Sequence, residues 1–264
     1  MDLRPVFPQN DVCLFSEGVR ERTWKINNIP PITLNYLSRW LQSELLSVAI
    51  DGIDVITNTS PLYDEQLAER LGLIPIEADP LRMDRFTGSS LADCTERTCL
   101  IFELNVTNST QGVMNVLSSD LRWVPIGNQA QLFIDRPPRP FFPQLLIARI
   151  YPGQSIQLRA YATLGTGAEH AKWSSLNALF SPFTPKAPMS QLVPVPKRYP
   201  TCITCEQVTV NTKFEPGFGC YYFTIGLTGG LTFEDVQRQL DSRFDWGNRY
   251  PPQPIRYSFQ EPRR

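Results

Sequence analysis

The sequence contains a single histidine, His170, and only five lysines beside twenty arginines. A Ser–His or Cys–His catalytic pair would have to use His170, and no G-x-S-x-G, phosphate-loop or H-E-x-x-H motif accompanies it. No apolar run approaches the ~20 residues that span a bilayer, and the N-terminal residues lack the apolar segment of a secretory signal. These absences disfavour the common enzyme classes and predict a soluble intracellular chain without membrane contact.

Neither sign of charge dominates the chain, whose formal net charge is −1. A protein that binds nucleic acid on its own usually presents a basic surface, because phosphate contacts supply most of its affinity. We therefore expect no direct DNA binding. Hydrophobic residues make up 42% of the 264 residues and charged residues 19%, which predicts one or two globular domains.

A stripe of apolar residues indicates a first long helix over 32–48. Its members follow one another at spacings of three and four residues: Leu34, Leu37, Leu41, Leu45 and Val48. Pro30 and Pro31 precede it, as is common at a helix start. On periodicity alone the stripe is interpreted as the face that packs on this chain's own core, although it could equally pack on a partner's helix.

A second amphipathic pattern predicts a closing helix over about 232–244. Thr232 is placed as its N-cap, with Asp235 three residues on in a capping-box arrangement. One face of this helix carries Phe233, Val236, Leu240 and Phe244. The segment 246–264 is rich in proline and arginine and is expected to be extended.

Strand patterns fill the middle of the chain and recur near its end. The predicted strands are 49–60, 100–106, 145–150, 156–161, 207–212 and 219–226. A short helix is predicted at about 63–72, with acidic residues in its first turn. Because helices and strands follow one another without regular β-α-β alternation, the predicted fold class is α+β.

The six cysteines are expected to be free thiols or metal ligands, since the chain is taken as intracellular. A zinc site would need four ligands, and Cys94, Cys99, Cys202 and Cys205 could supply them only if distant segments meet. Cys202 and Cys205 could instead form the dithiol of a thiol oxidoreductase, but the β-branched residues after them indicate a loop-to-strand context. We therefore predict no metal and no cofactor, and His170 is interpreted as a structural hydrogen-bonding residue.

Three ordered blocks carry a resemblance to a known family. The first is LNYLSR at 34–39, followed by Glu44 and AID at 49–51. The second is ITNTSPLYDE at 56–65, running into AERLGLIPI at 68–76. The third is GQ at 153–154, LRAYA at 158–162 and EHAKW at 169–173, and a weaker match covers 211–245. On these motifs the chain resembles the third-largest subunit family of eukaryotic and archaeal DNA-directed RNA polymerases, which corresponds to the bacterial alpha N-terminal domain.

The resemblance implies a two-domain, alpha-subunit-like fold. Residues 1–49 and 174–264 would form a discontinuous dimerisation domain, and residues 50–173 a mostly-β domain inserted in it. In the family the dimerisation helices pack on those of a smaller related subunit, and the heterodimer is the assembly platform for two large catalytic subunits. The implied interface residues are Leu34, Leu37, Leu41, Leu45, Val236, Leu240 and Phe244. The implied role is non-catalytic, with the second-largest subunit and small assembly subunits as further partners.

One departure from the family concerns the first helix. Family members usually carry two adjacent arginines there, and here Ser38 occupies the first position and only Arg39 remains. The expected contacts to a large subunit are Arg39, Asp64, Glu65 and Arg70. Alternatively, Arg70 forms a charge pair with Asp64 and Glu65 on the helix surface, without a contact to another subunit.

A second departure concerns zinc, because many eukaryotic members carry four zinc-binding cysteines in the inserted domain and only Cys94 and Cys99 remain here. These departures suit a divergent lineage, and a polymerase encoded by a large DNA virus is the leading hypothesis. The chain would then reside in the virion or host cytoplasm, and in the nucleus if the enzyme is cellular. The alternative function is a free-standing protein-interaction module.

Overall fold

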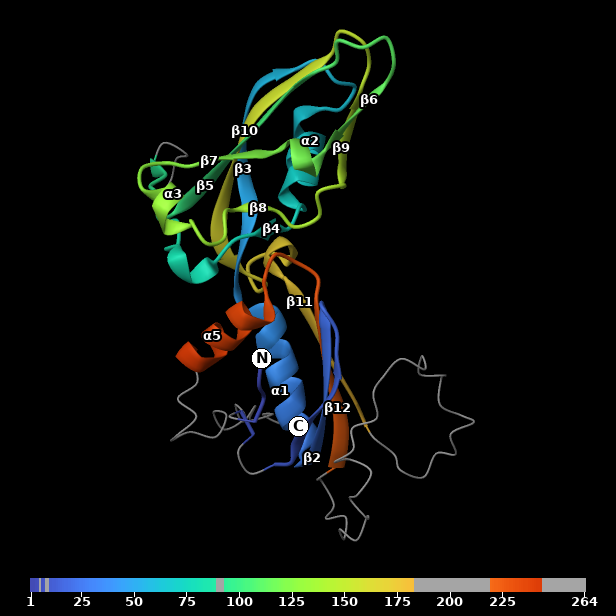
Figure 1. The fold of residues 1–264 in the computed structure, drawn as a ribbon, viewed down its shortest axis with the longest axis vertical. Helices are drawn as coiled ribbons and strands as arrows, with labels where there is room; N and C mark the ends of the chain where they lie inside the picture. Colours follow the sequence, from blue (N-terminus) through green and yellow to red (C-terminus); the bar gives the residue numbers. More distant parts are fainter. Residues whose placement is uncertain (5, 8–9, 89–92, 183–218, 244–264) are drawn as a thin grey trace, which may run out of the picture.

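A computed structural model describes residues 1–4, 6–7, 10–88, 93–182 and 219–243, and the structural statements below refer to these residues. The molecule is elongated, with two lobes that follow each other along its long axis (Figure 1). Each lobe is built around its own four-stranded antiparallel sheet. This mixture of helices and antiparallel sheets confirms the predicted α+β class.

The lower lobe joins the beginning and the end of the described chain. Across its sheet the strands are β1 (Val12–Glu17), β2 (Glu21–Ile29), β12 (Gly219–Leu227) and β11 (Leu176–Pro182). Strands β2 and β12 are neighbours although about two hundred residues separate them, and the hydroxyls of Thr23 and Thr224 lie 3.0 Å apart. Helix α1 (Pro31–Ser43) lies across one face of this sheet, and α5 (Phe233–Arg243) lies beside α1 (Figure 1).

Helix α1 is shorter than the sequence pattern predicts. It ends at Ser43, where the backbone N–H of Glu44 donates to the carbonyl of Trp40 at 2.9 Å. Strand β3 (Leu46–Asn58) begins three residues later, so Leu45 lies in the connection and Val48 in the strand. Val48 continues the leucine spacing, but pairing with a neighbouring strand overrides the helical periodicity there.

The upper lobe is built around a sheet whose order is β3, β10 (Ser155–Thr166), β5 (Cys99–Thr107) and β7 (Arg122–Val124). Two small sheets pair β4 (Ile76–Glu77) with β8 (Arg139–Pro140) and β6 (Met114–Leu117) with β9 (Leu146–Ile150). The remaining elements are helices α2 (Asp64–Gly72) and α3 (Gln129–Leu132) and the short 3-10 turns η1 (Pro80–Arg82), η3 (Ser118–Asp120) and η4 (Ala171–Trp173).

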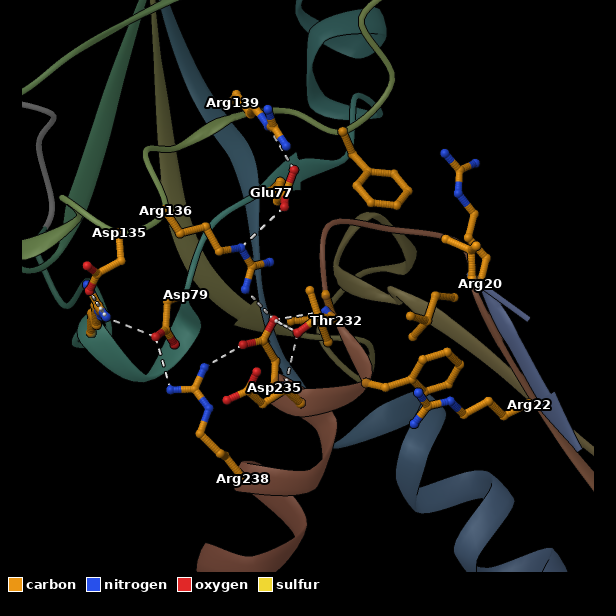
Figure 2. A pocket seen from close by; sticks show the side chains of 17 residues that line it. Arg20, Arg22, Glu77, Asp79, Asp135, Arg136, Arg139, Thr232, Asp235 and Arg238 are labelled. Carbon is orange, nitrogen blue, oxygen red and sulfur yellow. Dashed lines mark hydrogen bonds and ion pairs between the residues drawn. The ribbon is translucent and has the colours of Figure 1, made fainter. Parts of the chain in front are cut away.

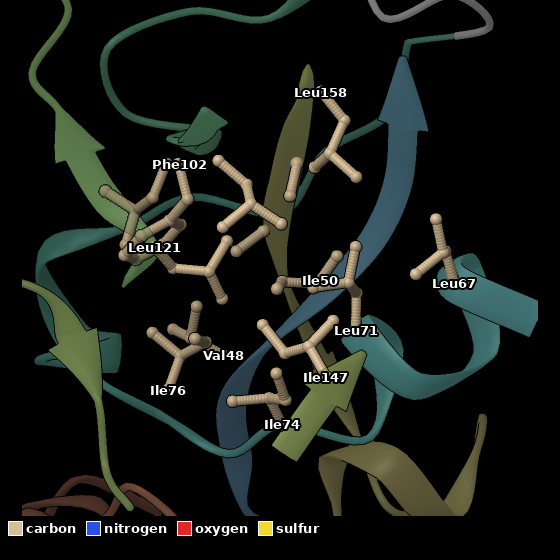
Figure 3. Close-up of a cluster of buried hydrophobic side chains, with 14 of the residues drawn as sticks. Val48, Ile50, Leu67, Leu71, Ile74, Ile76, Phe102, Leu121, Ile147 and Leu158 are labelled. Carbon is tan, nitrogen blue, oxygen red and sulfur yellow. The ribbon is translucent and has the colours of Figure 1, made fainter. Parts of the chain in front are cut away.

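Strand β10 is the centre of the upper lobe because it pairs with both β3 and β5. The predicted alternation over 156–161 is confirmed, since Ile156, Leu158 and Ala160 are buried and the residues between them face outward. Helix α2 and strand β9 cover the inner face of the sheet and add Leu67, Leu71 and other apolar side chains to its core (Figure 3).

The buried apolar side chains form two separate clusters, one in each lobe. The chain passes from the lower cluster to the upper one between Leu45 and Val48, and it returns between Leu164 and Leu176. At this crossing Leu46 pairs directly with Thr166, so the two connections run side by side. The predicted domain limits at 49/50 and 173/174 stay a prediction.

Two glycines allow the lobes to approach each other closely. A Cβ atom at Gly167, after β10, would overlap the carbonyl oxygen of Gln42 in α1. A Cβ atom at Gly230, before α5, would overlap the carbonyl oxygen of Ile76 in β4. Both contacts are backbone against backbone, so no side chain could move aside to make room.

The predicted strands at 100–106, 145–150 and 219–226 correspond to β5, β9 and β12. The predicted strand at 207–212 and the segment 246–264 lie outside the described residues. No helix in the described part of the chain has the length and apolar character needed to cross a membrane.

Candidate contact surfaces and the lobe junction

The apolar stripe proposed as a subunit interface lies inside the lower lobe. Its described members are at most 4% exposed: Leu34, Leu37, Leu41, Leu45, Val236 and Leu240. Phe244 lies outside the described residues. Side chains buried this far have almost no area to offer a partner, so the structure favours the core interpretation that periodicity alone supports. Their place at a subunit interface stays a prediction.

The opposite face of α1 carries exposed side chains suited to a protein contact. Ile32 is 60% exposed, Tyr36 is 39% exposed, and Arg39 is also exposed. Spacings of four and three residues place the three side chains on one helix face, which we call the α1 outer face. Aromatic residues and arginine are enriched in protein interfaces relative to other surface.

Ser38, which departs from the family pattern, lies on the inner face of α1. The Ser38 side chain is buried, and its hydroxyl donates to the carbonyl of Ala178 in β11 at 2.5 Å. Gln42, one turn further on, donates to the same carbonyl at 2.9 Å. Ser38 therefore faces the sheet of its own lobe and takes no part in the α1 outer face.

Asn58 organises the turn that leads from β3 into α2. Its amide oxygen accepts from the backbone and hydroxyl of Ser60 at 3.0 and 2.7 Å. Its amide nitrogen donates to the carbonyl of Leu62 at 2.8 Å and to the carboxylate of Asp64 at 2.7 Å. The asparagine of the second sequence block is thus a structural residue, and it fixes where the acidic start of α2 is presented.

The predicted surface pair between Arg70 and the acids of α2 does not form. Arg70 Nη1 donates instead to the carbonyl of Ile147 in β9, at 3.0 Å. Among the described residues Asp64 and Glu65 form no ion pair with it, and both lie exposed in the first turn of α2. The reason is that the Arg70 side chain reaches across to the neighbouring strand. Arg70 therefore ties α2 to β9, while both carboxylates stay exposed, that of Asp64 held by the Asn58 amide.

Figure 2 shows a cluster of arginines and carboxylates that joins the two lobes. Arg136, just before β8 in the upper lobe, donates to the Asp235 carboxylate in α5 at 2.6 Å and to the carbonyl of Gly230 at 2.9 Å. Its Nε lies 3.3 Å from a carboxylate oxygen of Glu77 in β4. One guanidinium thus contacts β4 in its own lobe and both Gly230 and the first turn of α5 in the other.

Arg238 makes the reciprocal connection from the lower lobe. Its guanidinium reaches Asp79 in the upper lobe at 3.1 Å and Asp235 in its own helix at 2.5 Å. Arg82 of η1 also binds Asp79, with its Nε 3.2 Å from a carboxylate oxygen. Asp79 is 5% and Asp235 1% exposed, so both carboxylates are buried and each is shared between two arginines.

Asp235 also caps its own helix. Its carboxylate accepts from the backbone N–H and the hydroxyl of Thr232, both at 2.8 Å, and its N–H donates to that hydroxyl at 3.2 Å. The predicted capping arrangement is therefore confirmed. Burial alone would raise the pKa of Asp235, but the hydrogen bonds and charge of Arg136 together with the Thr232 bonds hold that pKa below its ordinary value.

A cavity of about 750 Å³ lies at this junction and is lined by both lobes. On its outer side the guanidinium of Arg20 lies 4.9 and 4.8 Å from the ring centres of Phe141 and Phe142. Arg22 lies 4.4 Å from the ring centre of Phe233. The Arg20 contacts hold the turn between β1 and β2 against the other lobe, whereas the Arg22 contact joins β2 to α5 within the lower lobe.

The cysteines predicted as possible zinc ligands do not form a metal site in the described residues. Cys94 and Cys99 lie together, with their sulfurs 2.7 Å apart, and Cys202 and Cys205 lie outside the described part of the chain. Over the described ranges no three His, Cys, Asp or Glu side chains are placed to hold a metal ion. Burial, and then the adjacent Cys94 thiol, raise the pKa of Cys99.

His170 has the structural role that its sequence context predicts. Its Nδ1 accepts from the backbone N–H of Lys172 at 3.1 Å, at the start of η4. Lys172 pairs with Asp51 and lies 4.3 Å from the ring centre of Trp173. Residues 169–173 (EHAKW) are thus held against β3, next to the two connections between the lobes.

The junction cluster was not predicted from the sequence, apart from the capping role of Asp235. The cluster consists of Glu77, Asp79, Arg82, Arg136, Asp235 and Arg238, which come from three separated stretches of the chain. Two of its pairs lie three residues apart, but no sequence pattern links one stretch to another. A charged residue that will be buried looks like any surface charge in sequence. Residues 136–139 (RPPR) show no pattern other than two adjacent prolines, which favour a loop.

Comparison with known proteins supports the resemblance that the three sequence blocks carry. No family model matches the chain. Curated relatives are subunits of DNA-directed RNA polymerases, 34–37% identical over about 60% of the chain. They match the third-largest-subunit family, so the predicted resemblance is confirmed.

Three relatives illustrate the range of organisms in which similar subunits occur. The DNA-directed RNA polymerases I and III subunit RPAC1 of Saccharomyces cerevisiae is 34% identical over 184 residues, 63% of this chain and 55% of the relative. The subunit of that name from Homo sapiens is 36% identical over 154 residues, 53% of this chain and 44% of the relative. The DNA-directed RNA polymerase subunit Rpo3 of Pyrobaculum aerophilum is 35% identical over 158 residues, 59% of this chain and 55% of the relative. The chain spans about half the length of the curated relatives it matches.

Proposed function

We propose that this chain is a non-catalytic subunit of a DNA-directed RNA polymerase that pairs with a smaller related subunit and supports assembly of the large catalytic subunits. The similarity to RPAC1 and Rpo3 subunits carries the proposal. The junction cluster supports it physically, because buried ion pairs that share carboxylates hold the two lobes in one relative orientation. A platform that positions several partners needs such a fixed orientation.

Ile32 and Tyr36 of the α1 outer face are our proposed contact with the smaller subunit. We prefer them to the leucine stripe that the family resemblance implies, because they are exposed while the leucines are not. The leucines then act indirectly, by holding α1 on its sheet so that the outer face is presented in one geometry. The exposed carboxylates of Asp64 and Glu65, with Arg39, are proposed contacts to a large subunit.

The substitution Tyr36→Asp tests the proposed heterodimer contact. It places a charge in a contact that would bury it, so co-expression with the smaller alpha-like subunit of the same genome should yield no complex in a pull-down. Val113→Asp is the matched control, because Val113 is a 55% exposed apolar residue in the upper lobe. Circular dichroism and the thermal midpoint of both variants should match the unsubstituted chain.

The same assay separates contact from folding. Leu41→Asp should also lose the complex, but its circular dichroism should show a damaged lower lobe, because Leu41 is 1% exposed in the core. If Tyr36→Asp folds normally and still binds the smaller subunit, the α1 outer face is not the contact.

Purification of the tagged chain from its host tests the polymerase assignment itself. Stoichiometric recovery of two large polymerase subunits is expected, and their sequences would name the lineage, including a viral one. A nuclear location is proposed for a cellular enzyme, and the virion or host cytoplasm for a viral one. Recovery of the chain with unrelated partners only would favour the free-standing interaction module.

A further inference from the structure

The hexapeptide Cys94-Thr95-Glu96-Arg97-Thr98-Cys99 brings two thiols together at the edge of the upper lobe. Cys99 is the first residue of β5 and is fully buried, whereas Cys94 is half-buried in the preceding turn. Their sulfur atoms lie 2.7 Å apart. Neither thiol has a role in the proposed subunit contacts or in the junction cluster.

The turn between the cysteines is closed by its own backbone and by two threonines. The N–H groups of Thr98 and Cys99 donate to the carbonyl of Thr95, at 3.2 and 3.3 Å. The N–H of Thr95 donates to the hydroxyl of Thr98 at 3.0 Å, and the two threonine hydroxyls lie 2.9 Å apart. These bonds hold the two ends of the hexapeptide side by side.

Contacts from outside the turn fix it against the rest of the lobe. The side-chain amide of Gln129, which is itself fully buried, donates to the carbonyls of Glu96 and Cys99 at 2.8 and 2.7 Å. The Glu96 carboxylate accepts from the N–H of Asn128 at 2.7 Å. Arg97 pairs with Asp84 at 2.7 Å. The two thiols therefore meet because the surrounding structure places them, which makes their reaction with each other intramolecular and pre-oriented.

Metal binding does not account for this pair. A structural zinc site needs four ligands, and in the described residues no third ligand group joins the two sulfurs. A reaction that two adjacent thiols held in contact readily undergo is thiol–disulfide exchange.

We propose that Cys94 and Cys99 form a redox-active dithiol that a low-molecular-weight disulfide, such as glutathione disulfide, converts to an intrachain disulfide. Cys94, the more accessible thiol, loses its proton to solvent and attacks one sulfur of the oxidant, which breaks the oxidant's S–S bond and releases one thiolate. Cys99 then loses its proton and attacks the Cys94 sulfur of the mixed disulfide, which releases the second thiolate. The chain loses two protons and two electrons, and the oxidant is reduced to two thiols.

The oxidised pair would close a covalent ring over the turn 94–99. That ring would tie the segment before β5 to the first residue of the strand, without displacing the bonds from Gln129. The sequence alone predicts free thiols, because intracellular glutathione keeps most cysteines reduced. Whether Cys94 and Cys99 are oxidised would therefore depend on the ratio of oxidised to reduced glutathione around the chain.

Equilibration of the full chain in glutathione buffers of stepped ratio, followed by acid quenching, alkylation and peptide mass mapping, tests the proposal. Trypsin cleaves after Arg85, Arg97 and Arg122, so it separates Cys94 from Cys99. The expected product is peptide 86–97 joined to peptide 98–122, lighter than their sum by two hydrogen atoms and separated again by dithiothreitol. The Cys202→Ser/Cys205→Ser background removes the other closely spaced pair.

Cys94→Ser and Cys99→Ser should each abolish the joined peptide, while Cys13→Ser, the matched control at another half-buried cysteine, should leave it unchanged. Three outcomes overturn the proposal: both cysteines alkylated at every ratio, a stable glutathione adduct on Cys94 with Cys99 still free, or Cys94 joined to a different cysteine. The measurement is made on the unsubstituted sites, so poor folding of a serine variant would not obscure it.

Discussion

The two lobes reach similar cores by different routes along the chain. The upper core is formed by one continuous stretch, from Val48 to Leu164, whereas the lower core needs both the first and the last described segments. Closing a chain over that separation costs conformational entropy before any contact repays it. The upper lobe can therefore form as soon as its own stretch exists, and the lower lobe only after α5 and β12 are present.

The largest effect is expected when one buried aromatic ring is removed from each lobe. Phe102 in β5 and Phe223 in β12 are both fully buried. Each change to alanine should lower the free energy of unfolding by about 3–5 kcal/mol. Hydrogen exchange should show that Phe102→Ala increases exchange in the upper lobe and Phe223→Ala in the lower lobe. Equal increases in both lobes for both variants would mean that the lobes unfold as one unit.

Asp235→Asn tests how strongly the junction couples the lobes. The change removes the charge shared by Arg136 and Arg238, and loss of one partner of a buried ion pair costs about 3 kcal/mol. Chemical denaturation should then resolve two transitions where the unsubstituted chain shows one. Asp241→Asn on the same helix is the control, because Asp241 is exposed and should change stability by under about 0.5 kcal/mol.

Gly230→Ala tests the close approach of the lobes without changing any charge. The added methyl group overlaps the carbonyl of Ile76, so the lobes must separate slightly at a cost of about 1–3 kcal/mol. Gly112→Ala is the matched control, since nothing lies within 4 Å of its Cβ position. A thermal midpoint for Gly230→Ala equal to that of Gly112→Ala would show that the junction is looser than the structure indicates.

The smallest effect is the pH dependence of the junction. Because the folded pKa of Asp235 lies below its unfolded value, its contribution is present above the unfolded pKa and is lost as pH falls through the folded pKa. Unfolding measured at decreasing pH below about 4 should show stability falling more steeply in the unsubstituted chain than in Asp235→Asn. If the stability of both chains falls with pH at the same slope, Asp235 is not the group responsible for the pH dependence.

Local patterns predicted those parts of the fold whose causes are local. The Thr232–Asp235 cap and the alternation of 156–161 depend on residues a few positions apart, and both are confirmed. The end of α1 was misplaced because Val48 fits the helical spacing but is captured by β10, over a hundred residues away. The surface pair of Arg70 was wrong for the same reason, since its partner is a strand that the helix pattern does not include.

The candidate sites likewise divide into features that local sequence predicts and features that only the packing shows. Spacing identified the leucines of α1 as one face, but only the packing shows that this face is turned inward and that Tyr36 is turned outward. The three stretches that meet at the junction have no common sequence signal, because the energy of a buried arginine–carboxylate pair depends on which distant groups exclude water from it.

Because Leu46 pairs with Thr166, the stretch between them, which forms the upper lobe, could be removed as one unit. Its entry and exit lie on adjacent strands, about 5 Å apart, which is a gap that a two- or three-residue bridge can close. A gene could thus lose, enlarge or exchange everything between these positions while the ends of the lower lobe stay where they are. Proteins that share the lower lobe could in this way evolve different upper lobes, each joined at the same pair of strands.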